Sequence, residues 1–191
     1  SFELKDAAGL YDKLTAAGAS IGMAPGAEGI KTLGGLTQIA RGATGSSDQA
    51  AFAVEAMMRQ IVAKGDHGQT NIKDDFGVDV FTDKSQTKLR GIQDILVETI
   101  GGSKGNLPAL QKVFGEEGIR AIRPMVAAFN QAGEAAGANA TEAERRAAGE
   151  AALRTMLDRS INVAGDWTDV LQDAAQAQRD NSARMTAAGE A

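Results

Sequence analysis

The sequence predicts a mainly α-helical protein, an irregular multi-helix bundle with one small β-hairpin near residues 77–91. Three observations lead to this fold class. Aromatic residues make up only 4% of the 191 residues, so Leu, Ile, Val, Met and Ala must build the core, which suits closely packed helices. Apolar residues recur three and four positions apart along most of the chain. Ser46 with Gln49, and Thr141 with Glu144, have the spacing of capping boxes that start helices.

Composition excludes several classes of protein. The net charge of -5, without a basic cluster, argues against specific nucleic-acid binding by this segment. The chain has no cysteine, which excludes a disulfide framework and a thiolate zinc site. No apolar run approaches the roughly 20 residues that a membrane span requires. We therefore expect a soluble helical segment without a cofactor.

Three helices are predicted before residue 65. One face of the first helix, which Gly18 can end, carries Leu4, Leu10, Tyr11 and Leu14. The second helix is marked by Ile30, Leu33, Leu36, Thr37 and Ile39. The third begins at the Ser46 capping box, and its apolar stripe consists of Phe52, Val54, Met57, Met58, Ile61 and Val62. This third helix is expected to anchor the core.

The middle of the chain changes character. Residues 65–76 are polar and aperiodic, which predicts a loop. GVDVF, residues 77–81, then alternates with a period of two and predicts a short strand. The turn-forming TDKSQT and the following KLR can bring the chain back as a hairpin. A hairpin of this size depends on packing against helices for its stability.

The helical period resumes at Leu89 and ends at the glycine-rich stretch GGSKGN, residues 101–106. Pro108 fits the first turn of the following helix. In FGEEG, Gly115 can end that helix, two glutamates favour the positive start of another, and Gly118 permits a close approach. Pro124 cannot donate a helical hydrogen bond, so we expect two helical pieces there instead of one kinked helix.

Two further helices are predicted after residue 136, so the chain divides into residues 1–136 and residues 137–191. The first starts at the Thr141 capping box and carries Leu153, Met156, Leu157 and Ile161. Asp166 can cap the second, which bears Trp167, Val170 and Leu171. Beyond Ala175 the apolar face fades, and this last helix is expected to be extended.

No residue pattern predicts a catalytic or metal site. His67 is the single histidine and has no second histidine or cysteine near it in sequence. GGSKG, residues 101–105, lacks the spacing of a phosphate-binding loop and follows a helix. Asp75, Asp79 and Asp83 are four apart, without the glutamate that closes a calcium loop. Glu116 and Glu117 are adjacent, so on a helix they point about 100° apart and cannot face each other as an acid/base pair.

One enzyme family deserves comparison. GLTQIA, residues 35–40, resembles the G-L-x-Q element of lytic transglycosylases, and MAP, residues 23–25, lies where their F-N-P-like segment would. At about the position of that family's catalytic glutamate this chain has Ser20, which cannot protonate a glycosidic oxygen as a carboxylic acid can. Glu28 lies on the wrong side of Pro25 to replace it. We therefore expect no enzyme activity.

A second resemblance covers more of the chain, roughly residues 33–129. GVDVFTDKSQTKLRGIQDIL, residues 77–96, followed by LQKVFGEEGIRAI, residues 110–122, resembles the core region of tail tape measure proteins of long-tailed bacteriophages and prophages. The matching positions are Gly77, Val80, Phe81, Arg90, Asp94, Ile95, Leu96, Phe114 and Gly115. The turn between the two β-like segments is longer here and lacks the glycine often found in the family. The upstream stretch LTQIARGATGSSDQAAFAVEAM is similar to the family's helical lead-in.

The resemblance implies a structural role with no catalytic, cofactor or metal residues. Tape measure proteins set tail length inside the tail tube, and they interact with tube and tail tip proteins, with tail assembly chaperones and in some cases with copies of themselves. The expected location is the lumen of the virion tail, and the host cytoplasm during assembly. A generic helical interaction or scaffold module is the alternative, and a transglycosylase-like domain without its glutamate is a third reading.

Overall fold

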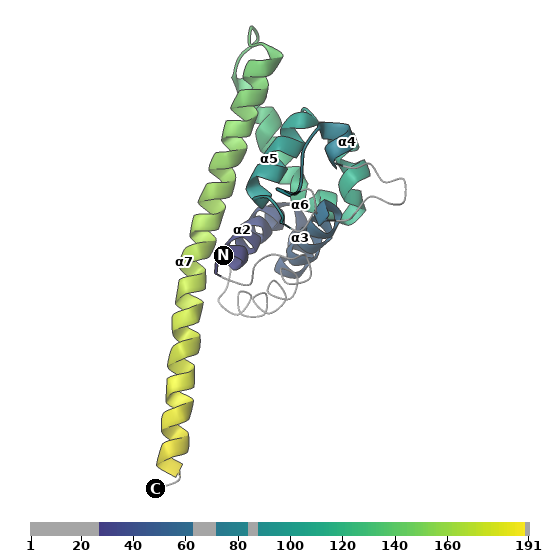
Figure 1. The fold of residues 1–191 in the computed structure, drawn as a ribbon. Helices are drawn as coiled ribbons and strands as arrows, with labels where there is room; N and C mark the ends of the chain where they lie inside the picture. Colours follow the sequence, from purple (N-terminus) through teal and green to yellow (C-terminus); the bar gives the residue numbers. More distant parts are fainter. Residues whose placement is uncertain (1–26, 63–71, 84–87, 190–191) are drawn as a thin grey trace.

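The structure, a computed structural model, describes residues 27–62, 72–83 and 88–189, and the side chains of the last helix as far as Gly165. The helices in these ranges are α2 (Ala27–Thr44), α3 (Ser47–Val62), α4 (Ile72–Phe76), α5 (Ile92–Gly102), α6 (Leu107–Ala135) and α7 (Glu142–Gly189). Figure 1 shows α2 to α6 gathered beside one part of α7, whose C-terminal part extends beyond them. The predicted mainly α fold is confirmed. The first predicted helix, with Tyr11, lies outside the described residues, as do Ser20 and His67.

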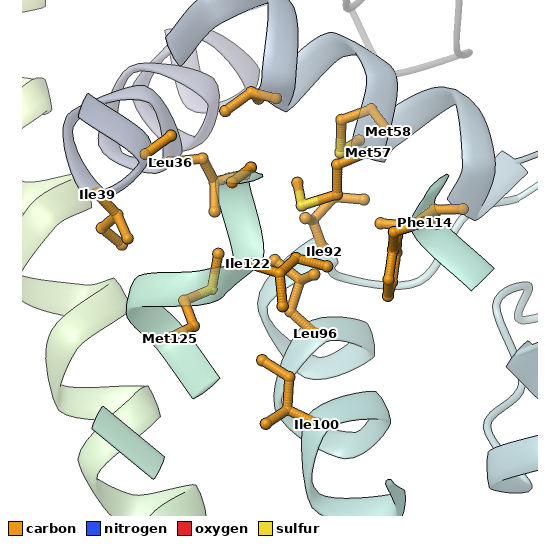
Figure 2. Close-up of a cluster of buried hydrophobic side chains, with 14 of the residues drawn as sticks. Leu36, Ile39, Met57, Met58, Ile92, Leu96, Ile100, Phe114, Ile122 and Met125 are labelled. Atoms are coloured by element: carbon orange, nitrogen blue, oxygen red, sulfur yellow. The ribbon is translucent and has the colours of Figure 1, made fainter. Parts of the chain in front are cut away.

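The core is aliphatic, as the low aromatic content predicts. Fully buried side chains come from α2, α3, α5, α6 and the first half of α7, and Figure 2 shows Leu36, Met57, Ile100, Phe114 and Met125 converging. Leu153 and Leu157 of α7 belong to the same core, each 0% exposed. The predicted boundary at residue 136 therefore falls in the α6–α7 connection, and the helices on its two sides share one core.

Helix α2 packs against α7 through glycines. A Cβ atom built on Gly35 would lie 2.9 Å from both the Cα and the N of Ile161, and one on Gly34 would lie 3.2 Å from the Cβ of Ala164. The approach at Gly35 requires glycine, because real Cβ atoms essentially never lie so close to backbone atoms, whereas the contact at Gly34 is only tighter than usual. The second predicted helix is confirmed, with Leu33 and Leu36 buried.

Helix α3 starts as predicted, because the Ser46 Oγ accepts a hydrogen bond of 3.2 Å from the backbone N–H of Gln49. Met57, Met58 and Ile61 are buried along its stripe. The placement of Phe52 in that stripe is wrong, since Phe52 is 50% exposed. At 100° per residue, Phe52 lies about 180° around the helix from Ile61, so the face that buries Ile61 turns Phe52 outward.

Residues 72–91 differ most from the prediction. The end of the predicted loop is the short helix α4, whose Ile72 is buried and whose first turn contains Asp74 and Asp75. The predicted hairpin is reduced to one antiparallel bridge between Phe81 and Leu89, and no strand forms in the described part of the chain. An isolated pair of strands has only marginal stability in water. Here the chain enters α5 directly after the bridge, and no further pairing of the two segments is seen in the described residues.

Helix α5 ends where the glycine-rich stretch predicts. Ser103 follows the last helical residue, and Lys104 and Gly105 both have positive φ, 55° and 67°. A Cβ on Gly105 would lie within 3.0 Å of the side chains of Phe129 and Asn130, so this turn is packed directly against α6. The reading of residues 101–105 as a helix terminator is confirmed.

Helix α6 contains the predicted joint. Asn106 caps its start with a 3.0 Å hydrogen bond from the N–H of Ala109, and Pro108 lies in its first turn. Gly115 interrupts the helix with φ 68° and ψ -179°, a region that only glycine occupies readily. Gly118 permits the expected close approach, because a Cβ there would lie 3.1 Å from the Cα and N of Met57.

The prediction of a second break at Pro124 is wrong, because α6 continues through it to Ala135. A proline inside a helix costs about 3 kcal/mol, whereas full burial of one large aliphatic side chain contributes about 1.5–3 kcal/mol. Ile122, Met125 and Val126 surround Pro124 in sequence and are all buried. Their combined burial outweighs the cost of the proline.

Helix α7 begins with the predicted capping box. The Glu144 carboxylate accepts hydrogen bonds of 2.7 and 2.8 Å from the N–H and Oγ1 of Thr141, and the Thr141 Oγ1 accepts one of 3.2 Å from the N–H of Glu144. The prediction of two C-terminal helices is wrong, since one helix runs from Glu142 to Gly189. Gly165 and Asp166 each cost a helix about 1 kcal/mol or less, which is too little to end it without a proline.

Candidate functional site: the segment from Gly77 to Gly115

The residues of the tape-measure resemblance follow one path through the fold. Gly77 has φ 70° and ends α4, with its N–H donating a 2.8 Å hydrogen bond to the carbonyl of Lys73. Val80 is half-buried against the core, and Phe81 is half-buried at the single β-bridge. These three residues guide the chain from α4 toward α5.

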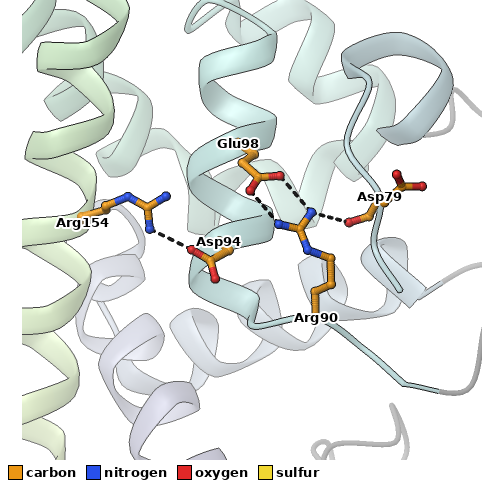
Figure 3. A network of polar contacts seen from close by, with 5 residues as sticks. All are labelled: Asp79, Arg90, Asp94, Glu98 and Arg154. Carbon is orange, nitrogen blue, oxygen red and sulfur yellow. Dashed lines mark hydrogen bonds and ion pairs between the residues drawn. The ribbon is translucent and has the colours of Figure 1, made fainter. Parts of the chain in front are cut away.

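Arg90 links the chain between α4 and α5 to α5 itself through side-chain hydrogen bonds. Its guanidinium donates hydrogen bonds of 2.9 and 2.6 Å to the two carboxylate oxygens of Glu98, and one of 2.7 Å to the backbone carbonyl of Asp79 (Figure 3). The hydrogen bond to Glu98 is the main cause that raises the pKa of Arg90, while burial opposes it. Because the pair is bidentate and the Arg90 side chain is only 25% exposed, it holds one geometry better than an ordinary surface ion pair.

Asp94 links α5 to α7. Its carboxylate accepts a hydrogen bond of 2.8 Å from Arg154, 60 residues away in sequence (Figure 3). That interaction raises the pKa of Arg154. Both side chains are about half exposed, so the ion pair contributes less than about 1 kcal/mol. Its role is to orient the two helices.

The remaining resemblance residues lie in the core. Ile95 and Leu96 are both 0% exposed on α5, and Phe114 is 1% exposed on α6 immediately before the Gly115 break. All nine positions therefore have a structural role in the turn, the ion-pair network, the core or the break. Along the chain they run from the end of α4, through α5, to the break inside α6.

The other polar candidates have structural partners or form no cluster. Glu116 accepts a 2.6 Å hydrogen bond from Gln111, and Glu117 lies 3.5 Å from Arg120. Among the residues that the structure describes, no group of three His, Cys, Asp or Glu side chains is arranged to hold a metal ion. Within the described ranges, none of the helices is long and apolar enough to cross a membrane.

A hollow of about 270 Å³ lies at the end of the bundle, where α6 gives way to α7. Its lining includes Lys104, Phe129, Asn130, Glu142 and Arg145. Lys104 forms an ion pair with Glu142 at 2.5 Å, which lowers the pKa of Glu142. The guanidinium of Arg145 donates to three backbone carbonyls of the α6–α7 connection at 3.1 Å. These two cations are thus engaged within the chain instead of facing a ligand.

Sequence reasoning missed the partners of Arg90 and Asp94. Glu98 is four residues after Asp94, so the helical period places both carboxylates on the same face of α5. This spacing could have identified Glu98 as a member of the same polar network. Arg154 carries no such local signal, because its proximity to Asp94 depends on how α7 crosses α5.

Comparison of the chain with protein-family models, with curated proteins and with solved structures gives no match.

Proposed function

We propose that this chain is a non-enzymatic structural protein of a phage or prophage tail, a segment of the tape measure protein that sets tail length inside the tail tube. The observation that carries the proposal is the role of the resemblance residues. Each of the nine has a position-specific structural role in one segment, including the Arg90–Glu98 pair and the Gly115 break.

The long helix supports the same proposal. Helix α7 has 48 residues, and at a rise of about 1.5 Å per residue it spans about 72 Å. A continuous helix of this kind converts the number of residues into a length, which is the property that a molecular ruler needs. In this proposal the partners are tail tube and tail tip proteins and tail assembly chaperones, and the location is the tail lumen.

The first experiment tests the location. Tails are purified from bacteria that carry the gene, and peptides of this chain are sought by mass spectrometry in the tail fraction. We expect the chain in assembled tails, together with tube protein. Its absence from purified tails, with the chain present in the remaining cell extract, would favour a cellular scaffold module and overturn the proposal.

The second experiment tests the ruler. Six additional copies of residues 168–188, a block of three heptads, are inserted in frame after residue 188, and in a second strain one block is deleted. The insertion adds about 126 residues, so we expect tails longer by about 190 Å in electron micrographs, and slightly shorter tails after the deletion. Unchanged tail lengths in both strains would contradict the ruler role.

A third measurement concerns catalysis. The purified chain is incubated with peptidoglycan, and soluble muropeptides are measured. We expect no release, because the sequence has Ser20 at the approximate position of the transglycosylase glutamate. Release that a single carboxylate substitution abolishes would instead make the chain an enzyme.

A further inference from the structure

Phe52 is an aromatic side chain that the bundle leaves outside its core. It is 50% exposed, on the side of α3 opposite the buried Ile61. Asp48 precedes it by four residues and Glu55 follows it by three, so both carboxylates flank the ring on the same face of the helix. Glu55 pairs with Arg59 at 3.7 Å, and both side chains are about half exposed. Phe52 is therefore a protruding ring with carboxylates beside it.

The hollow beside the α6–α7 connection has room for such a ring. Its volume is about 270 Å³, whereas a cavity of about 150 Å³ already holds benzene. Phe129 and Gly133 are part of its lining. The Phe129 ring packs directly against Gly105 and Gly149, since a Cβ built on these glycines would lie 3.0 and 2.5 Å from ring atoms. A second aromatic ring in the hollow would thus lie beside Phe129, and such aromatic pairs are favourable.

The charges around the hollow complement those around Phe52. Three cationic and two anionic side chains line it, namely Lys104, Arg145, Arg146, Glu134 and Glu142. This positive excess suits a ring that is flanked by carboxylates. Arg146 is the cation with donors to spare, because its Nε donates a 2.7 Å hydrogen bond to Glu150 while its terminal nitrogens have no partner within the described residues. The Arg146 side chain is 49% exposed, so a partner can reach it.

We propose that Phe52 of one copy of this chain inserts into the hollow of a second copy, with Glu55 facing Arg146 across the contact. Phe52 cannot fill the hollow of its own copy. Gly118, where α6 touches α3 at Met57, and Gly133, at the hollow, are separated by about 22 Å along α6. Buried side chains hold α3 in place, so it cannot bring Phe52 across this distance.

The contact joins two different surfaces, so each copy keeps one free ring or one free hollow. Such heterologous contacts give head-to-tail chains or closed rings. A second copy is favoured as the occupant because the ring and its flanking carboxylates match the hollow in size and in charge. One ring with its neighbouring charges makes a small contact, so we expect weak association. The proposal does not depend on where the chain is located, so it is tested separately from the tail role.

Sedimentation velocity of the full chain tests the contact. We expect the sedimentation coefficient of the unmodified chain to rise between about 10 µM and about 1 mM. Phe52→Ala removes the ring and Arg146→Glu reverses the charge at the hollow, and each should raise the dissociation constant by about tenfold or more. Val163→Ala is the matched control, since Val163 is also an exposed large hydrophobic residue, and it should change the constant by less than about twofold. Circular dichroism checks that every variant keeps its helices.

A mixture of the two variants separates this contact from other modes of association. Phe52→Ala keeps the hollow and Arg146→Glu keeps the ring, so we expect an equimolar mixture to form pairs although neither variant associates by itself. Three outcomes would overturn the proposal. The unmodified chain could stay monomeric up to about 1 mM, which would leave the hollow to a different partner. Phe52→Ala and Val163→Ala could have equal effects, which would indicate non-specific association. The mixture could also stay monomeric, which would mean that Phe52 and Arg146 do not belong to one contact.

Discussion

A substitution at Gly115 can measure the cost of its backbone conformation separately from any steric clash of an added side chain. Gly115 has φ 68° and ψ -179°, and a Cβ built on it meets no atom within 4 Å. Gly115→Ala therefore introduces no clash, and only the backbone conformation carries a cost. That region of backbone space costs a residue with a side chain about 1–3 kcal/mol. The smaller entropy of the unfolded chain offsets about 0.4–1 kcal/mol, so the net loss lies between about 0 and 2.6 kcal/mol, with about 1.3 kcal/mol at the centre of the range.

Gly42→Ala is the matched control. Gly42 lies inside α2, is exposed, and its Cβ would also meet no atom within 4 Å. Because its conformation is helical, alanine should stabilise the protein by about 0.5–1 kcal/mol. Urea titrations followed by circular dichroism should therefore give midpoints that shift in opposite directions, with similar m-values. If Gly115→Ala stabilised the protein as Gly42→Ala does, α6 would be unbroken at residue 115 and our reading of the joint would be refuted.

Three further predictions follow from side chains. Phe114→Ala should lower the free energy of unfolding by about 3–5 kcal/mol, whereas Glu116→Ala should lower it by less than about 1 kcal/mol. Urea titrations of the two variants measure both losses. If the losses were equal and small, Phe114 would lie outside the core. The Thr99 hydroxyl is buried without a hydrogen-bond partner, so Thr99→Val should raise the free energy of unfolding by about 1 kcal/mol, and a loss would imply a missed partner. Hydrogen bonds from the Thr141 N–H and hydroxyl lower the pKa of Glu144, so its stabilising effect is present above the ordinary glutamate pKa and is lost as pH falls through the lowered value. An NMR titration should show that Thr141→Val raises this pKa, and an unchanged pKa would argue against the capping box.

Local signals predicted most of the helices. The Ser46 side chain caps α3, the capping box at Thr141 forms in full, and Gly115 breaks α6 where the sequence places a joint. These features depend on residues within a few positions of one another, so the sequence is sufficient to locate them. The resemblance residues were likewise located within elements of the expected kind, apart from the hairpin around Phe81.

The errors arise where packing competes with a local preference. Pro124 should break a helix, but the burial of Met125 and its neighbours keeps α6 continuous. Phe52 is apolar, yet the direction of the α3 face that contacts α6 decides that it is exposed. The Asp94–Arg154 ion pair joins residues that only the crossing of two helices brings together. None of these outcomes is encoded in a short window of sequence.

The contact between Gly118 and Met57 has a consequence for how natural variation in this chain should be interpreted. A substitution at Gly118 would press against backbone atoms of α3 at 3.1 Å, and backbone atoms cannot rotate away as a flexible side chain can. Selection for folding alone would then favour glycine at this position among descendants of the gene, and would do so more strongly than at Gly42, where an added Cβ meets no atom within 4 Å. If Gly118 proved invariant, the reason would be the close packing of α6 against α3, and the invariance would not indicate a binding partner at that surface.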